Sequence, residues 1–174
     1  MLIAMAGLPA TGKSTIAREL AVRLGAVLLD KDKVRAALFK PEDIEYTTKQ
    51  NDFCMDIVFQ VAEYLIKKEP LRNIIIDGRP FSKRYQVDRL VAFATRIATP
   101  LKIIECTVSD EDAKKRLEND RSRGNHLAAN RNFDLFLHVK LQADAIEEPK
   151  LVINTSELAL TASVEKAVDY ILAR

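Results

Sequence analysis

Short apolar runs alternate along the chain with segments in which apolar residues recur every three or four positions. The runs have the length of buried strands, and the periodic segments are typical of amphipathic helices. The apolar runs predict strands at residues 2–6, 26–29, 73–76, 101–108 and 151–154. The periodic segments predict helices at residues 13–24, 32–39, 47–67, 82–97, from 109 onward, 132–146 and 161–172. This alternation predicts a three-layer α/β/α fold whose mostly parallel, five-stranded sheet is covered by helices on both faces.

The longest periodic segment, residues 47–67, predicts a helix with one buried face. Thr47 or Thr48 can cap it, because a threonine side chain accepts a hydrogen bond from a backbone N–H of the first turn. The residues expected to face inward are Phe53, Ile57, Val61, Tyr64 and Leu65.

A phosphate-binding motif separates the first strand from the first helix. Residues 7–15 read Gly7-Leu8-Pro9-Ala10-Thr11-Gly12-Lys13-Ser14-Thr15, which matches G-x-x-x-x-G-K-[ST]. The two glycines allow tight turns that point successive N–H groups into one concavity, at the N-terminus of the helix that follows. Lys13 can reach the β- and γ-phosphates, and the Ser14 hydroxyl can ligate Mg²⁺. The motif predicts that this loop binds a nucleoside triphosphate; ATP is expected, because no Asn-Lys-x-Asp run that would select guanine is present.

Two carboxylates and an arginine directly follow the second predicted strand. Ligands of parallel sheets bind at the carboxyl ends of the strands, so Asp30, Asp32 and Arg35 are candidate site residues. Asp32 can act as a general base for an acceptor hydroxyl, with Arg35 one turn later to bind the acceptor. Asp30 is expected to assist, or to contact Mg²⁺ through water. The alternative is that one aspartate only caps the helix and the arginine is solvated.

The third predicted strand also ends in a carboxylate, Asp77, followed by Gly78 and Arg79. A carboxylate at this place can hold the Mg²⁺ shell opposite Ser14, and Arg79 would then point towards the acceptor or the γ-phosphate. The alternative is an ordinary Asp-Gly turn.

A basic segment follows the fourth predicted strand. Residues 114–131 carry six lysines and arginines against two acidic residues, and Gly124 interrupts the helical pattern. Arg121 and Arg123, with Arg116 and more weakly Arg131, can form a cationic lid over residues 116–131 that stabilises the transferring phosphoryl group. The alternative is a basic helix end that complements the helix dipole.

Composition narrows the function classes. The chain of 174 residues fits a single domain, and its net charge of +2 gives no broad nucleic-acid footprint. No stretch is long and apolar enough for a membrane span or a signal peptide. Cys54 and Cys106 lack metal-binding or redox spacing, so reduced thiols and a cytoplasmic location are expected. His126 and His138 are expected to be ordinary surface residues.

Taken together, these motifs resemble the small P-loop kinases, specifically the zeta-toxin-like, polynucleotide-kinase-like and chloramphenicol-phosphotransferase-like group with an AAA-type ATP-binding domain. Gluconate kinase and adenylylsulfate kinase belong to the same group. The resemblance covers essentially the whole chain, residues 1–174, as one kinase domain with an acceptor-side helical segment at about residues 32–68 and a lid at about residues 116–131.

Individual motifs carry this resemblance. Polynucleotide kinase has a base Asp after the second strand and an acceptor-binding Arg three residues later, which Asp32 and Arg35 match. Adenylylsulfate kinase has D-G-D-x-x-R there, which residues 30–35 match except for Lys31. Residues 77–80 are similar to the D-G-x-P of adenylate kinases, with Gln86 near the place of their substrate-reading Gln. The usual Arg after that Pro is Phe81 here, which argues against a nucleoside monophosphate acceptor.

The resemblance implies an adenylate-kinase-like fold and Mg²⁺-dependent transfer of the γ-phosphate of ATP to a hydroxyl group. Lys13, Asp32, Arg121 and Arg123 would be catalytic, and Arg116 would join the loop in binding ATP. A small-molecule acceptor is favoured. A polynucleotide 5′-hydroxyl, a nucleoside or nucleotide, and a regulatory, toxin-like module that binds ATP without transfer are the alternatives. The acceptor pocket is expected between residues 32–68 and the turn at residues 79–85.

Overall fold

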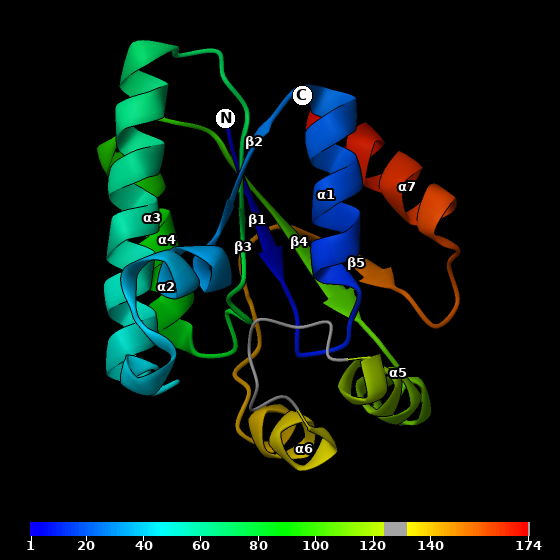
Figure 1. The fold of residues 1–174 in the computed structure, drawn as a ribbon. Helices are drawn as coiled ribbons and strands as arrows, with labels where there is room; N and C mark the ends of the chain where they lie inside the picture. Colours follow the sequence, from blue (N-terminus) through cyan, green and yellow to red (C-terminus); the bar gives the residue numbers. More distant parts are fainter. Residues whose placement is uncertain (124–131, 174) are drawn as a thin grey trace.

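The computed structural model describes residues 1–123 and 132–173. Five strands alternate with helices along this part of the chain (Figure 1). The strands are β1 (Leu2–Ala6), β2 (Val27–Asp30), β3 (Ile74–Asp77), β4 (Leu101–Thr107) and β5 (Lys150–Asn154). The helices are α1 (Lys13–Leu24), α2 (Lys31–Leu38), α3 (Thr48–Lys68), α4 (Arg84–Arg96), α5 (Asp110–Arg123), α6 (Phe133–Leu141) and α7 (Leu160–Leu172), with a short 3₁₀ turn at Pro41–Asp43.

The strands form one sheet in the order β2-β3-β1-β4-β5, and every pair in it is parallel. Helices α3 and α4 cover one face, and α1 and α7 cover the other (Figure 1). The predicted three-layer α/β/α fold with a parallel five-stranded sheet is confirmed.

The alternating side chains of the central strand β1 supply both cores. Leu2 and Ala4 pack towards α3 and α4, while Ile3 and Met5 pack towards α1 and α7. Both sets are fully buried. A strand buried on both faces must be apolar at every position, and this requirement explains the continuous run at residues 2–6.

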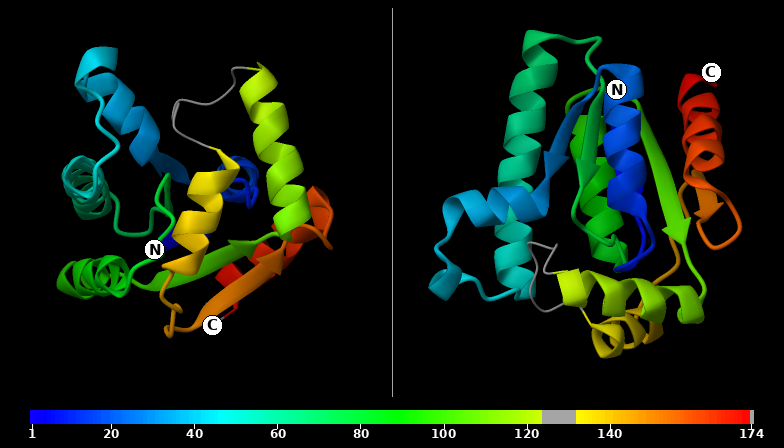
Figure 2. Two further views of the ribbon diagram at one scale, coloured as in Figure 1. Left: turned by 90° about the horizontal axis from the view of Figure 1, so that it is seen from below. Right: turned by 45° about the vertical axis from the view of Figure 1, so that its right-hand side comes forward.

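Three helices lie at the carboxyl edge of the sheet rather than on its faces. These helices are α2, which packs on α3, and α5 and α6, which pack on each other. α2 lies on one side of the end of β1, and α5 and α6 lie on the other (Figure 2). A small apolar cluster of Ala10, Ala113, Leu117 and Phe136 joins α5 and α6 to the loop after β1. The edge where ligands of parallel sheets bind is therefore walled on two sides.

The buried face of α3 differs from the predicted one. Phe53, Val61 and Tyr64 were expected to face inward but are exposed, and Ile57 and Leu65 are only half-buried. The buried side chains are Gln50, Cys54, Met55, Val58, Phe59, Ala62 and Ile66. The prediction was wrong because apolar residues occur around most of this helix, so their spacing alone does not define one face.

Two helix boundaries also differ from the prediction. α6 ends at Leu141 rather than at residue 146, and α4 begins at Arg84 with Lys83, not Ser82, before it. Asp144 explains both differences. Its carboxylate accepts a hydrogen bond from the Arg84 backbone N–H at 2.8 Å, and its own N–H donates to the Ser82 carbonyl at 3.0 Å. The chain after α6 thus caps α4 instead of continuing as a helix.

Within the described residues, no helix has the length and apolar character that crossing a membrane requires.

Replacing Phe59 by alanine is expected to lower the free energy of unfolding by about 3–5 kcal/mol. The substitution removes a ring that is 9% exposed and stacks on Phe93 with centroids 4.5 Å apart. Phe53 on the same helix is 51% exposed, so Phe53→Ala is expected to cost less than about 1 kcal/mol. Urea unfolding followed by circular dichroism compares the two; similar losses would contradict the buried face described for α3.

Candidate functional site

The phosphate loop joins β1 to α1, and its backbone geometry requires its glycines. Gly7 has a φ of +129°, and a Cβ atom there would lie 2.3 Å from the carbonyl oxygen of Cys106 on β4. Gly12 has a φ of +78° and is the N-cap residue of α1. The loop therefore leads directly into a helix N-terminus whose first N–H groups have no partner within the helix, which is the geometry of an anion-binding site.

Lys13 and Ser14 open helix α1 beside the loop. Lys13 is buried, and its Nζ donates a hydrogen bond to the carbonyl of Leu8 across the loop at 3.2 Å. Thr11 Oγ1 donates to the same carbonyl at 2.8 Å. Lys13 and Ser14 both line the cavity described below, where the motif predicts that phosphates bind.

Arg116 connects α5 to the phosphate loop. Its Nη1 donates to the Ala10 carbonyl at 3.1 Å and to Thr155 Oγ1 at 2.8 Å, and its Nη2 donates to the Thr155 carbonyl at 2.8 Å. Thr155 Oγ1 also lies 3.0 Å from the carbonyl of Thr11. Arg116 therefore fixes the loop against the segment that follows β5.

A second cavity, of about 250 Å³, adjoins this arginine. It lies between the start of α1, Arg116 and the segment that leads into α7, and its walls include the apolar residues Ile16, Leu158 and Leu160. A flat apolar group attached to a phosphate chain in the loop would fit between these walls.

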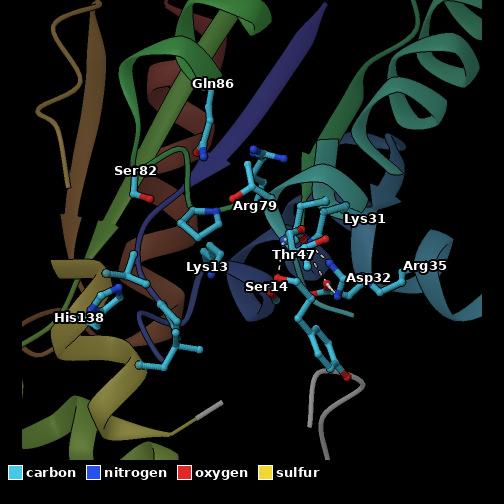
Figure 3. A pocket seen from close by; sticks show the side chains of 18 residues that line it. Lys13, Ser14, Lys31, Asp32, Arg35, Thr47, Arg79, Ser82, Gln86 and His138 are labelled. Atoms are coloured by element: carbon cyan, nitrogen blue, oxygen red, sulfur yellow. Dashed lines mark hydrogen bonds and ion pairs between the residues drawn. The ribbon is translucent and has the colours of Figure 1, made fainter. Parts of the chain in front are cut away.

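The main cavity, of about 490 Å³, opens at the carboxyl edge of the sheet. Figure 3 shows Lys13 at its centre, with Lys31, Asp32 and Arg35 on one side. The other side is lined by Ser82, Gln86 and His138. The cavity has the volume of a small-molecule site.

Asp32 is held by two cations. Its Oδ1 lies 2.9 Å from Lys31 Nζ and 3.0 Å from Arg35 Nη1. Asn51 on α3 accepts hydrogen bonds from both of these cations through its Oδ1. Both contacts are made to Oδ1, and Asp32 itself lines the cavity.

Asp30 has a different role from Asp32. Its Oδ1 accepts the backbone N–H of Asp32 at 2.9 Å, which makes it the N-cap of α2, and Asp30 is not among the residues that line the cavity. Burial raises the pKa of this carboxyl, and the nearby Asp77 raises it further, against the hydrogen bond from Asp32. Of the two candidate bases, Asp32 is the one at the cavity.

Asp77 ends β3 and is 1% exposed. It pairs in register with Asp30 of β2, and its Oδ1 has no hydrogen-bond partner among the described residues. Burial raises the pKa of the nearby Cys106 thiol to about 12. Asp77 also raises this pKa, and Lys13 lowers it. A buried carboxylate oxygen without a donor is suited to a cation or to metal-bound water.

This donor set fits Mg²⁺ but not a metal held by protein alone. Within the described chain there is no group of three or more His, Cys, Asp or Glu side chains that could ligate a metal. Mg²⁺ usually takes one or two protein ligands and completes its shell with water and phosphates. Ser14 and Asp77 are the candidates for those protein ligands, with the phosphates of a nucleotide supplying others.

Arg79 is buried, 4% exposed, at the wall of the cavity. Its Nη2 forms an ion pair with Asp52 of α3 at 2.6 Å and donates to the Tyr85 hydroxyl at 3.0 Å. Asp52 also pairs with Arg89 at 3.3 Å. Arg79 was expected to reach the acceptor or the γ-phosphate. In the structure its guanidinium joins α3 to α4, and the residue also lines the cavity.

The predicted lid is only partly within the described chain. Arg121 and Arg123 belong to the last turn of α5, but their side chains lie outside the described part. Gly124, His126 and Arg131 lie outside the described residues altogether. Residues 116–123 are helical, and Arg116 donates a hydrogen bond from this helix to the loop backbone.

Several residues that line the cavity or contact Arg116 were not among the predicted site residues. Lys31, Thr155 and His138 take part in the site, and Asn51 was expected only as a general part of the pocket. Lys31 had one signal, its replacement of the Gly in D-G-D-x-x-R. Thr155 had none, because its contact with Arg116 spans 39 positions of the chain.

Comparison with known proteins agrees with this geometry. The chain matches the AAA domain family over residues 2–138. No curated protein matches it. Among solved structures, a gluconokinase from Sinorhizobium meliloti 1021 superimposes with a TM-score of 0.70 at 16% identity, covering 97% of this chain and 90% of that one.

Two further structures have nucleotide analogues bound. An APS kinase from Mycobacterium tuberculosis, in complex with AMPPNP and APS, has a TM-score of 0.75 at 14% identity, with 99% and 97% of the two chains covered. Kti12 from Chaetomium thermophilum, in complex with ADP-AlF3, has a TM-score of 0.66 at 14% identity, with 99% and 100% covered. At these identities the likeness establishes the fold. The chain belongs to the AAA domain family and has the fold of the small P-loop kinases.

Proposed function

We propose that this protein transfers the γ-phosphate of ATP to a hydroxyl group of a small-molecule acceptor, with Mg²⁺. One observation carries the proposal. Lys13 and Ser14 of the phosphate loop line the same cavity as Asp32 and Arg35. A phosphate donor in the loop and a hydroxyl beside Asp32 would therefore meet in one cavity, and holding reactants together in this way supplies much of the catalysis in phosphoryl transfer.

The donor would extend from the phosphate loop to Arg116. Its phosphates would lie against residues 7–15, and its base would occupy the cavity of about 250 Å³ lined by Leu158 and Leu160. Arg116 would bind ATP by keeping the loop in shape and by packing against the base. The structures of the APS kinase with AMPPNP and of Kti12 with ADP-AlF3 support nucleotide binding by this fold.

Ser14 and Asp77 are proposed to hold the metal. When bound there, Mg²⁺ would neutralise negative charge on the phosphates. The buried, unpartnered Oδ1 of Asp77 supports this assignment.

Asp32 would act as the general base. Its Oδ1 is fixed by Lys31 and Arg35, so its Oδ2 can accept the proton of the acceptor hydroxyl. The acceptor oxygen bonds to the γ-phosphorus as the bond from phosphorus to the bridging oxygen breaks, and ADP leaves. Lys13 would stabilise the charge on the transferring group, together with Arg121 and Arg123, which are proposed on sequence grounds.

A small acceptor is favoured over a polynucleotide end by the size of the site. The main cavity of about 490 Å³ lies between α2, α3 and α6 and suits a metabolite-sized ligand.

A transfer screen tests the proposed function. Purified protein with [γ-³²P]ATP and Mg²⁺ is expected to label a metabolite or antibiotic in a pooled set, and Lys13→Ala is expected to abolish labelling. Labelling of 5′-hydroxyl oligonucleotides alone would favour a polynucleotide kinase. ATP binding without transfer to any acceptor would favour a regulatory module.

Replacing Asp32 by asparagine is expected to lower kcat on the identified acceptor by about 10²–10⁴-fold, because the general base is lost. The exposed Asp43, replaced in the same way, provides the matched control and should leave kcat unchanged. Steady-state kinetics with both variants decide the point; near-normal turnover by Asp32→Asn would refute the assigned role.

Replacing Arg116 by alanine is expected to weaken ATP binding by about 10- to 100-fold, because the loop loses charge-assisted hydrogen bonds. Lys115 is exposed and pairs only with Glu111 of its own helix among the described residues, so Lys115→Ala should bind ATP normally. Isothermal titration calorimetry measures both. Equal affinities in the two variants would show that Arg116 does not support the donor site.

A further inference from the structure

We propose that the acceptor carries an anionic group, a carboxylate or a phosphate monoester, and that Lys31 binds this group and so determines acceptor specificity. The inference rests on the proposed function, because it concerns the acceptor side of the same cavity. Three observations carry it: the place of Lys31 in α2, the charge around it and the chemistry of the two cavity walls.

Lys31 occupies a place that is unfavourable for a lysine. It is the first residue of α2, where the helix dipole repels positive charge, and it is 5% exposed. Its pKa is lowered by burial and by the neighbouring Arg35 and Arg79, against the attraction of Asp32. A buried cation at a helix N-terminus costs stability, and an anionic ligand in the adjoining cavity would offset that cost.

At the cavity wall two cations, Lys31 and Arg35, share one carboxylate, Asp32. Arg79 pairs with Asp52, and Arg89 pairs with both Asp52 and Asp56. Arg35 Nε, on the same helix as Lys31, is buried without an acceptor among the described residues, and Asp77 Oδ1 and Gln86 Oε1 are buried without a donor. Asp30 and Asp77 lie nearby, but Asp30 caps α2 and neither lines the cavity.

Lys31 retains a hydrogen-bond donor for a ligand. Its ammonium group has three N–H donors, and its described partners are Asp32 Oδ1 at 2.9 Å and Asn51 Oδ1 at 2.7 Å. The residue lines the main cavity, beside the carboxylate proposed as the base. An anionic group bound to Lys31 would therefore place a neighbouring hydroxyl of the same molecule near Asp32 Oδ2.

The opposite wall of the cavity suits hydroxyl groups. Ser82, Gln86 and His138 offer hydrogen bonds there and bring no carboxylate (Figure 3). The two walls together match a small molecule with an anionic group at one end and hydroxyls along the rest. We therefore expect a polyhydroxy acid or a phosphate ester of a polyhydroxy compound.

Direct binding to matched pairs of probes tests this inference. The pairs are D-gluconate with D-glucitol, glucose 6-phosphate with glucose, and adenosine 5′-phosphate with adenosine. Calorimetry is carried out on the full chain saturated with AMPPNP and Mg²⁺, so that the phosphate loop is occupied. At least one anionic member is expected to bind ten or more times as tightly as its neutral partner, and the pair that shows the preference distinguishes a carboxylate from a phosphate.

Variants at two positions of α2 identify the residue responsible. Lys31→Gln is expected to reduce the anionic preference about 10- to 100-fold, Lys31→Arg to keep most of it, and Lys33→Gln, at an exposed lysine of the same helix, to leave it unchanged. AMPPNP affinity, expected to be the same in all three, verifies that the variants are folded.

Two results would overturn the inference. One is equal binding of anionic and neutral members in every pair. The other is a Lys31→Gln variant that keeps the anionic preference. A Lys31→Gln variant that loses turnover equally on both members of a pair would also contradict the inference, because Lys31 would then only position Asp32. Either result leaves the proposed function standing if the transfer screen succeeds, and failure of that screen does not alter the binding measurement.

Discussion

The parallel pairing of β3 between β1 and β2 is the constraint on which the candidate site depends. Parallel strands end at the same edge of a sheet, and the register places Asp30 directly opposite Asp77. The phosphate loop leaves β1 at that same edge. Three segments that are far apart in the sequence thus deliver their polar residues to one place. A shift of one residue in β3 would turn Asp77 to the other face of the sheet.

The two apolar cores make this edge possible. Strands β1 and β3 are buried on both faces, so the sheet is anchored by side chains that have no part in the chemistry. The edge itself contains buried charges, Lys13, Lys31, Arg35, Asp77 and Arg79, whose desolvation costs free energy. These charged side chains stay buried because the packing of the two apolar cores fixes the strands and loops that carry them.

The donor side could be predicted from sequence because its chemistry restricts residue type at fixed spacing. Gly7 and Gly12 both have a positive φ, and Gly7 also lies too close to β4 for a side chain. The glycines of the motif therefore predict the backbone geometry of the loop. The alternation of strands and helices predicted the sheet for a similar reason, since each strand is a short apolar run. These signals are local, and local signals can be read from the chain alone.

The acceptor side could not be predicted to the same extent, because it depends on contacts between segments. A lysine between two aspartates reads as a solvated residue, and only the packing of α2 on α3 shows that Lys31 is buried against Asn51. The choice between Asp30 and Asp32 likewise needed the cap geometry of α2. The buried face of α3 was predicted wrongly because Phe53 and Tyr64 are apolar but exposed, while Gln50 is polar but buried.

Backbone strain in the described chain is concentrated around this same edge. Four residues other than glycine have a positive φ: Ala10, Tyr46, Phe81 and Ala98. Ala10 belongs to the phosphate loop, Tyr46 lines the main cavity, and Phe81 lies between two lining residues. Tyr46 places its ring 4.9 Å from the Arg35 guanidinium, so an unfavourable backbone conformation supports a contact at the acceptor wall. Strained conformations persist only where the surroundings fix them, and three of these four residues lie at or beside the cavity. Backbone, charge and sequence therefore identify the same edge of the sheet as the part of this protein shaped for a ligand.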